Sequence, residues 1–252
     1  MTVESPLAPG LRGQELTGQT AVIIGGSSGI GLSTAEAVRA AGGDVVLTGR
    51  DAGRLAEAAA RTQAVGTEAF DATDHDALVA FFQGLETPID HVMVSAGGSY
   101  YAPLAEIDFD RARREVDEHV LLAFDVARQI AGRVRSGGTL LLMSGTGARR
   151  PGIGLGVASA ITAAMPAVVA NLALEIAPIR VNLIAPGFVD TPLSARLLGD
   201  ELDARRAELR ETLPTGRVVG PADVAALAVH LMANTALTGA VYDIDGGQQL
   251  AR

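Results

Sequence analysis

The segment Thr20-Ala21-Val22-Ile23-Ile24, which continues directly into Gly25-Gly26-Ser27-Ser28-Gly29-Ile30-Gly31, decides the fold class of this 252-residue chain. A short apolar run that ends in glycines is typical of a buried strand, and helical spacing follows over residues 30–41. Glycines let the backbone turn tightly and approach a pyrophosphate, which the free N–H groups at the start of the next helix attract. In this context the pattern predicts a dinucleotide-binding site, with an ordinary turn as the alternative.

The rest of the sequence repeats this alternation of short strand-like runs and longer helical patterns. Further strands are predicted at residues 44–48, 68–70, 91–95, 139–143, 179–184 and 240–244. Further helices are predicted at residues 53–62, 76–83, 108–134, 152–174 and 222–232. This order predicts an α/β fold, namely the doubly wound parallel sheet of a three-layer Rossmann fold. Since no linker divides residues 17–252, we expect one domain there, after an N-terminal tail at residues 1–16.

The composition excludes several classes of function. The net charge is −9, so no nucleic-acid partner is expected, because an acidic protein repels phosphate backbones. Cysteine is absent, which excludes disulfides and thiolate chemistry, and the four histidines lack the spacing of metal ligands, so no metal site is expected. All 20 basic residues are arginines, which excludes every mechanism that needs a lysine.

Two segments bear on the location of the protein. The N-terminal residues are polar and contain prolines, without the apolar core of a signal peptide, so a cytoplasmic location is expected. Residues 152–174 carry no charge and are long enough to imitate a membrane span. Pro166, Asn171 and the position between two predicted strands favour a buried, alanine-rich helix instead, and burial at a subunit contact would suit it. No membrane association is therefore expected.

The end of the second predicted strand indicates which dinucleotide is bound. A carboxylate there would hold the ribose hydroxyl of NAD, but the sequence has Thr48 and Gly49 followed by Arg50. A guanidinium pairs well with the additional phosphate of NADP, so NADP(H) is the predicted cofactor. A solvated surface arginine is the alternative reading, and the neighbouring Asp51 keeps NAD(H) as the second choice.

Further motifs stand at the ends of the predicted strands. They are Asp71-Ala72, Ser95-Ala96-Gly97, Arg180-Val181-Asn182, Ala185-Pro186-Gly187 and Asp245-Gly246-Gly247. With the glycine pattern, they resemble the short-chain dehydrogenase/reductase family over residues 17–249. The resemblance implies an oxidoreductase with cofactor contacts at Gly25, Ser27, Ser28, Gly29, Ile30, Gly31, Gly49, Arg50, Asp71, Ala72, Ser95, Ala96, Gly97, Pro186, Gly187, Val189 and Thr191.

The catalytic residues of the family are an Asn, a Ser, a Tyr and a Lys, and this chain departs from all of them. Registering the chain on its flanking motifs places His119, Gly145, Ala158 and Thr162 at these positions, in that order. A shift in register cannot restore the pair of Tyr and Lys, because lysine is absent and the tyrosines are Tyr100, Tyr101 and Tyr242. Loss of a general acid slows a reaction by about 10²- to 10⁴-fold without forbidding it.

Some residues are candidates to replace the missing groups. His119 is the first, because imidazole titrates near neutrality, and Ser144 is the second; a structural histidine and a turn serine are the alternatives. Tyr100, Tyr101 and Arg149 are predicted to line the substrate pocket, although loop arginines are commonly solvated. Residues 193–213 resemble the substrate lid of the family.

Three hypotheses follow. The first is an NADP(H)-dependent reductase with an atypical active site, which transfers a hydride to a small-molecule acceptor. The second is a catalytically silent NADP(H)-binding protein, acting as a sensor or a non-catalytic subunit. The third is a scaffold that binds no cofactor. The resemblance also implies a homo-oligomer, a dimer or tetramer, that packs through residues 108–134 and 152–177.

Overall fold

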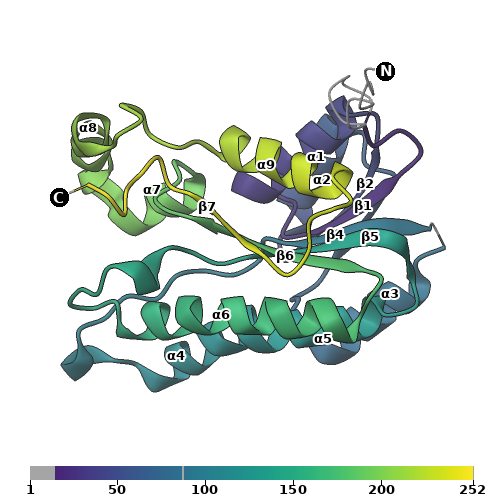
Figure 1. Cartoon of the computed structure of the whole chain (residues 1–252), viewed down its shortest axis with the longest axis horizontal. Coiled ribbons are helices and arrows are strands. Elements are labelled where there is room, and N and C mark those ends of the chain that lie inside the picture. The colour runs from purple at the N-terminus through teal and green to yellow at the C-terminus, as the bar shows by residue number, and fades with distance from the viewer. Residues whose placement is uncertain (1–14, 87, 252) are drawn as a thin grey trace, which may run out of the picture.

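A computed structural model describes residues 15–86 and 88–251 and confirms the predicted doubly wound fold. The middle layer is a seven-stranded sheet in the order β3-β2-β1-β4-β5-β6-β7, and every neighbouring pair is parallel (Figure 1). The strands are β1 (Thr20–Ile24), β2 (Asp44–Gly49), β3 (Gly66–Ala69), β4 (Ile89–Val94), β5 (Val134–Met143), β6 (Arg180–Pro186) and β7 (Val241–Ile244).

Helices cover both faces of the sheet. One face carries α1 (Gly29–Ala40), α2 (Ala52–Thr62) and α9 (Pro221–Ala233), and the other carries α3 (His75–Gly84), α4 (Phe109–Val116), α5 (Leu122–Ile130) and α6 (Gly156–Glu175) (Figure 1). Two further helices, α7 (Pro192–Leu198) and α8 (Leu202–Thr212), lie beyond the end of β6. Short helical turns are η1 (Leu104–Glu106), η2 (Asp117–Leu121), η3 (Gly147–Arg149) and η4 (Gly199–Glu201).

Each face of the sheet has its own hydrophobic core. Alternate residues of β1 point to opposite faces, so Val22 and Ile24 join the core under α3, α5 and α6, while Ile23 joins the core under α1, α2 and α9. All residues of β1 are buried, as expected for a central parallel strand. The strand order reverses direction between β1 and β4, and open α/β sheets bind ligands at the carboxyl ends of the strands at such a point.

The segment predicted as one long helix over residues 108–134 is interrupted. It consists of α4, the π-helical turn η2 and α5, and from Val134 it continues as the first part of β5. Val134 pairs with Ile89 of β4, so pairing in the sheet overrides the helical pattern at this end. The region predicted as a lid, residues 193–213, is helical and comprises most of α7, η4 and α8.

Helix α6 is the uncharged helix of the sequence, and it is not buried all round. By length and composition it could cross a membrane, but here it packs along β6, and 28% of its apolar window is buried in the chain. Ala160, Ala163, Ala167 and Leu174 lie on its exposed side. The predicted buried, alanine-rich helix is therefore buried on one side among the described residues, and burial of its other side at a subunit contact stays a prediction.

The packed structure begins earlier than the sequence predicted. Leu16 is fully buried in the core under α1, and its backbone N–H donates to the carbonyl of Ala41. Leu16 was expected to belong to the tail, and this is a correction. Its apolar side chain fills the space beside Val38, so it is part of the sheet domain. The expected tail otherwise falls on residues 1–14, outside the described residues, and on Glu15.

Candidate cofactor site and catalytic end

The glycine loop after β1 is packed too tightly for side chains at two positions. A Cβ on Gly25, where φ is +89°, would lie 2.6 Å from the backbone nitrogen of Ala96. A Cβ on Gly31 would overlap the carbonyl oxygen of Gly25 and lie 2.5 Å from Ser95 Oγ. The loop therefore sits directly against the end of β4, and the first turn of α1 starts at the same place.

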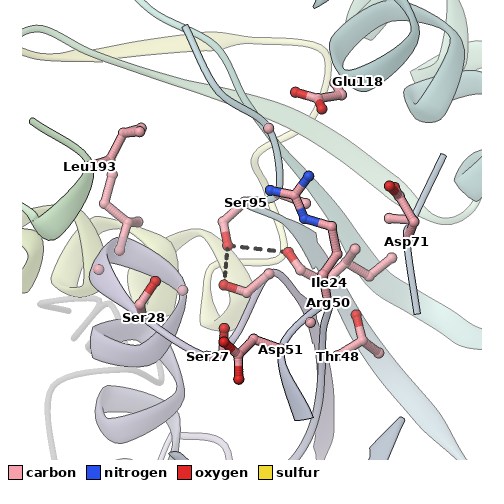
Figure 2. A pocket seen from close by; sticks show the side chains of 18 of the residues that line it. Ile24, Ser27, Ser28, Thr48, Arg50, Asp51, Asp71, Ser95, Glu118 and Leu193 are labelled. Carbon is pink, nitrogen blue, oxygen red and sulfur yellow. Dashed lines mark hydrogen bonds between the residues drawn. The ribbon is translucent and has the colours of Figure 1, made fainter. Parts of the chain in front are cut away.

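Ser95 fastens this arrangement. Its hydroxyl lies 3.2 Å from the carbonyl oxygen of Ile24 and 3.3 Å from that of Gly25, to which it donates (Figure 2). The backbone N–H of Ser95 also donates to the Ile24 carbonyl. Ser95, which was predicted to lie beside the cofactor, thus holds the ends of β1 and β4 together.

Most residues predicted to contact the cofactor line one cleft at this edge of the sheet. They are Gly25, Ser27, Ser28, Gly29, Ile30, Gly31, Gly49, Arg50, Asp71, Ala72, Ser95, Ala96, Gly97 and Thr191. The cleft also has walls that the sequence prediction missed, contributed by Ile24, Thr48, Arg54, Phe70, Thr73, Glu118, Leu122, Leu193 and Arg196. Arg54 and Thr73 could have been found, since each follows a predicted strand end by a few residues.

The rim of the cleft beyond β2 is basic. Arg50 extends over the cleft between Asp71 and Ser95 (Figure 2). Asp51 is the N-cap of α2: one of its oxygens accepts from the Arg54 backbone N–H at 3.0 Å and the other from Arg54 Nε at 3.0 Å. These two hydrogen bonds lower the pKa of the Asp51 carboxyl. Arg50 and Asp51 thus both line the cleft, but the Asp51 carboxylate is already engaged by Arg54.

Asp71 is held in place by its neighbour Thr73. Its carboxylate accepts from the Thr73 backbone N–H at 3.1 Å and from the Thr73 hydroxyl at 2.8 Å. Burial opposes ionisation of Asp71, but these hydrogen bonds and the charges of Arg50 and Arg114 outweigh it and lower its pKa. An ionised carboxylate at this point can accept hydrogen bonds from a bound base.

The predicted contacts after β6 divide into two groups. Thr191 lines the cleft, and its hydroxyl accepts from the Ser194 N–H as the N-cap of α7. Pro186, Gly187 and Val189 do not line it. A Cβ on Gly187 would meet Gln248 and Asp245, and Val189 is buried beside Val219, so these residues hold the loop to the C-terminal segment. Cofactor contacts at Pro186, Gly187 and Val189 stay a prediction.

The positions assigned to the catalytic Ser, Tyr and Lys do come together. Thr162 on α6 lies against Gly145 and Gly147: a Cβ added to Gly145 would be 3.7 Å from its side chain, and one added to Gly147 would be 3.5 Å from it. The Cβ added to Gly147 would also lie 4.0 Å from the backbone of Ala158. Ser144 Oγ is buried without a hydrogen-bond partner among the described residues. The hydroxyls of Thr162 and Ser159 donate to the backbone carbonyls of Ser159 and Gly147.

His119 lies on η2, with its ring against the loop after β4. Its Cε1 and Nε2 atoms are 3.2 and 3.3 Å from the place that a Cβ on Gly97 would take. Nδ1 is 2.9 Å from the carbonyl oxygen of Glu115. The neighbouring Glu118 accepts a hydrogen bond from the Gly98 backbone N–H at 3.0 Å and reaches the cleft. His119 is therefore the ionisable candidate that lies next to a cleft residue.

The residues predicted for the substrate pocket have other partners. Tyr100 is buried, and its hydroxyl accepts from the Asp108 N–H at 2.7 Å and contacts the Glu106 carbonyl, so it supports its own loop. Arg149 forms an ion pair with Asp243 on β7, which satisfies its guanidinium. Tyr101 is exposed at the surface. None of the three lines the cleft at the glycine loop, and their place in a substrate pocket stays a prediction.

Comparison with known proteins identifies the family. The family model described as Enoyl-(Acyl carrier protein) reductase matches residues 24–249. The chain belongs to the short-chain dehydrogenase/reductase family. It is 33% identical to a cis-4-hydroxycyclohexanecarboxylate dehydrogenase of Sinomonas cyclohexanicum, over 93% of this chain and 98% of the relative. It is 26% identical to the short-chain dehydrogenase/reductase malC of Malbranchea aurantiaca, over 97% of this chain and 100% of the relative.

Solved structures agree with this assignment. The chain resembles the MalC Reductase/Diels-Alderase of Malbranchea aurantiaca with a TM-score of 0.87 and 25% identity, covering 94% of this chain and 98% of that one. It resembles a small-chain dehydrogenase in complex with NADPH with a TM-score of 0.79 and 27% identity, covering 92% and 99%. The protein is thus a short-chain dehydrogenase/reductase-type oxidoreductase, a class that binds nicotinamide cofactors and acts on small molecules.

Proposed function

We propose that this protein is an NADP(H)-dependent reductase that transfers a hydride to a small-molecule acceptor. The observation that carries the choice of NADP(H) is the rim of the cleft, where Arg50 faces inward and Asp51 is held by Arg54. A guanidinium binds a phosphate strongly through charge-assisted hydrogen bonds. The Asp51 carboxylate already accepts two hydrogen bonds from Arg54, which leaves it fewer acceptor sites for a ribose hydroxyl and makes NAD(H) the second choice.

The residues present fit a dinucleotide. The tight packing at Gly25 and Gly31 leaves backbone alone beneath the site of a pyrophosphate, and the N-terminus of α1 begins at Gly29. Ser27, Ser28 and Thr191 would provide hydroxyls along the phosphates, and Asp71 with Ala72 would border the adenine. When bound, the reduced nicotinamide would supply the hydride.

We further propose that the active site departs from the family pattern. The register that places Ala158 and Thr162 at the Tyr and Lys positions is supported by their contact with Gly145 and Gly147. Neither side chain can donate a proton to an alkoxide as a phenol does, and the chain contains no lysine. His119 is our first candidate for the proton donor and Ser144 the second.

The test separates binding from turnover. Calorimetry with NADPH and NADH should show tighter binding of NADPH, and a panel of activated C=C, C=N and polarised carbonyl acceptors should give saturable NADPH oxidation with one of them. Equal affinity for the two cofactors would contradict the role of Arg50. NADPH loss at the protein-free rate with every acceptor would contradict the reductase function.

A second candidate function is supported by the same replacements at Ala158 and Thr162. A silent NADP(H)-binding protein would need the cleft residues but no proton donor. It predicts tight NADPH binding without turnover of any acceptor. Efficient turnover of a single compound would end this alternative.

We also propose a homo-oligomer that packs through α4, α5 and α6. Phe109, Leu121 and Phe124 are exposed on the first two helices with their linking turn, beside the exposed alanines of α6. Adjacent exposed apolar groups of this kind are typical of an interface between subunits. Light scattering should give the mass of a dimer or tetramer, and Ala163→Glu, in the middle of the exposed side, should reduce it to that of the monomer.

The domain that we propose begins at Leu16, and its lid spans residues 193–213. The ion pair between Arg206 on α8 and Asp190 supports the lid assignment, because it joins the lid to the segment that carries Thr191. Leu193 and Arg196, which belong to the proposed lid, line the cleft. Limited proteolysis should cut within residues 193–213 first, and NADPH should slow the cut.

A further inference from the structure

The side chain of Glu115 faces His119 one helical turn away. The imidazole Nδ1 is 3.8 Å from the Glu115 Oε2 and 2.9 Å from the Glu115 carbonyl oxygen. Both side chains are largely buried, with 17% of His119 and 14% of Glu115 exposed. An acid and a base this close and this sheltered interact more strongly than a surface pair.

The hydrogen bond at Nδ1 determines which ring nitrogen can exchange a proton. The carbonyl oxygen of Glu115 can only accept, so Nδ1 carries the hydrogen in both protonation states. The nitrogen that gains or loses a proton is therefore Nε2, the one that lies beside Gly97. Gly97 lines the cofactor cleft, so Nε2 is on the side of the ring nearest the cleft.

The surroundings of the pair leave Glu115 as the carboxylate closest to the ring. Arg111 on the same helix stacks on the ring of Tyr100 at 4.5 Å, and Glu118 on η2 is engaged by the Gly98 N–H. Helix α6 packs against η2 and carries no ionisable side chain before Glu175. Burial and the charge of Glu118 raise the pKa of the Glu115 carboxyl, whereas the charges of His119 and Arg111 oppose this.

We infer that Glu115 is a positioning residue whose carboxylate favours the imidazolium form of His119, from which Nε2 delivers the proton that the reduction consumes. The inference rests on the proposed reductase function. In it, Glu115 of α4 and His119 of η2 take over the role of the missing Tyr and Lys. A bound reduced nicotinamide would supply the hydride to the acceptor carbon, and the π electrons would move to the acceptor heteroatom as a lone pair. That lone pair takes the Nε2 proton, the imidazole becomes neutral, and water reprotonates it.

The first experiment examines the pair without any acceptor. The Cε1–H signal of His119 is assigned by its loss in His119→Gln and followed by NMR against pH in the cofactor-free protein. Glu115→Gln should move the midpoint of this titration about one pH unit lower, since a nearby carboxylate favours the charged ring. The midpoint in Glu115→Asp should fall between those of the wild-type protein and Glu115→Gln. Glu211→Gln, which removes an exposed carboxylate on α8, is the matched control and should leave the midpoint unchanged.

The second experiment uses an acceptor that the wild-type enzyme reduces. The alkaline limb of the kcat profile should move about one pH unit lower in Glu115→Gln, and Glu115→Asp should recover part of this shift. The affinity for NADPH should stay within about twofold, because Glu115 does not line the cleft.

The outcomes are distinct. An unchanged midpoint of the His119 ring in Glu115→Gln overturns the inference, and so does an unchanged pH profile when turnover is present. If no acceptor is reduced although NADPH binds, the proposed reductase function fails, and with it the delivery of the proton. Loss of NADPH binding in Glu115→Gln would show that the role is structural and would also overturn the inference.

Discussion

The two halves of the sheet serve the same cleft in different ways. In the half that contains β1, β2 and β4, the glycine loop, Arg50 and Asp71 line the cleft, close to the pattern of the family. In the half that contains β5 and β6, Thr162 meets Gly145 and Gly147, which the proposed register assigns to the place of the usual proton donors. Under the proposed function, the fold retains the residues that would hold a cofactor while those that would handle the proton differ.

The largest effect should come from breaking the binding half at Gly31. In Gly31→Ala the new methyl group would overlap the Gly25 carbonyl oxygen and press on Ser95, both of which lie at the junction of β1 and β4. Overpacking of this kind should destabilise the fold by about 3 kcal/mol and abolish measurable NADPH binding. Urea unfolding and calorimetry would measure the two effects.

The control for this change is Gly156→Ala at the start of α6, where no atom lies within 4 Å of the added Cβ. It should leave stability and NADPH binding within experimental error. A Gly31→Ala protein with normal NADPH affinity would mean that the glycine loop is not built around a cofactor.

The next effect should appear at the phosphate rim. Arg50→Ala should weaken NADPH binding by about 10- to 100-fold, because one charge-assisted contact to a phosphate is lost. NADH binding should change by less than about threefold. Calorimetry with both cofactors measures the ratio, and Arg61→Ala on the outer side of α2 is the matched control. Equal losses for the two cofactors would argue against a phosphate at Arg50.

The catalytic half can be sharpened by restoring what it lacks. The combined substitution Ala158→Tyr and Thr162→Lys should raise the rate of carbonyl reduction about 100-fold, at the low end of what a general acid provides. Ala158→Phe with Thr162→Met is the control, since it adds similar bulk without a proton donor. Stopped-flow measurement of NADPH oxidation would compare them. Equal rates in the two proteins would contradict the assigned register.

The smallest effect should arise where the lid meets the rest of the cleft. Arg206 donates to both oxygens of Asp190, at 2.9 and 2.7 Å, and both side chains are about one-third exposed. Asp190→Asn should therefore weaken lid docking by at most about 1 kcal/mol and raise KM two- to fivefold with little change in kcat. Steady-state kinetics measures this, with Asp200→Asn as control. A changed kcat with an unchanged KM would argue that the pair does not act through the lid.

The sequence predicted the binding half well, for physical reasons. The run from Thr20 to Ile24 is recognisable because a buried parallel strand must be apolar, and the glycines after it because close packing leaves no space for side chains. Both features depend on consecutive residues, so they can be recognised in the sequence. The strand bounds of β1 agree exactly, and those of α1 and β2 agree within one residue.

The remainder could not be read in this way because it depends on contacts between distant segments. Tyr100 is buried and its hydroxyl accepts from the N–H of Asp108, while Arg149 pairs with Asp243 on the last strand. No residue next to Tyr100 or Arg149 in the sequence indicates these partners. Similarly, the helical pattern before Val134 gave no sign that the chain would leave α5 to join β4.

Asp51 shows how the preference for one cofactor can become difficult to reverse. The same carboxylate begins α2, by accepting from the N–H of Arg54, and orients the guanidinium of Arg54 beside the cleft. A lineage that recruited Asp51 to a ribose would surrender the start of a helix, at about 1 kcal/mol, before gaining any affinity. Selection would therefore meet a barrier on that path, and Gly49 offers no free alternative, because an added Cβ there would lie 3.0 Å from Ser27 Oγ.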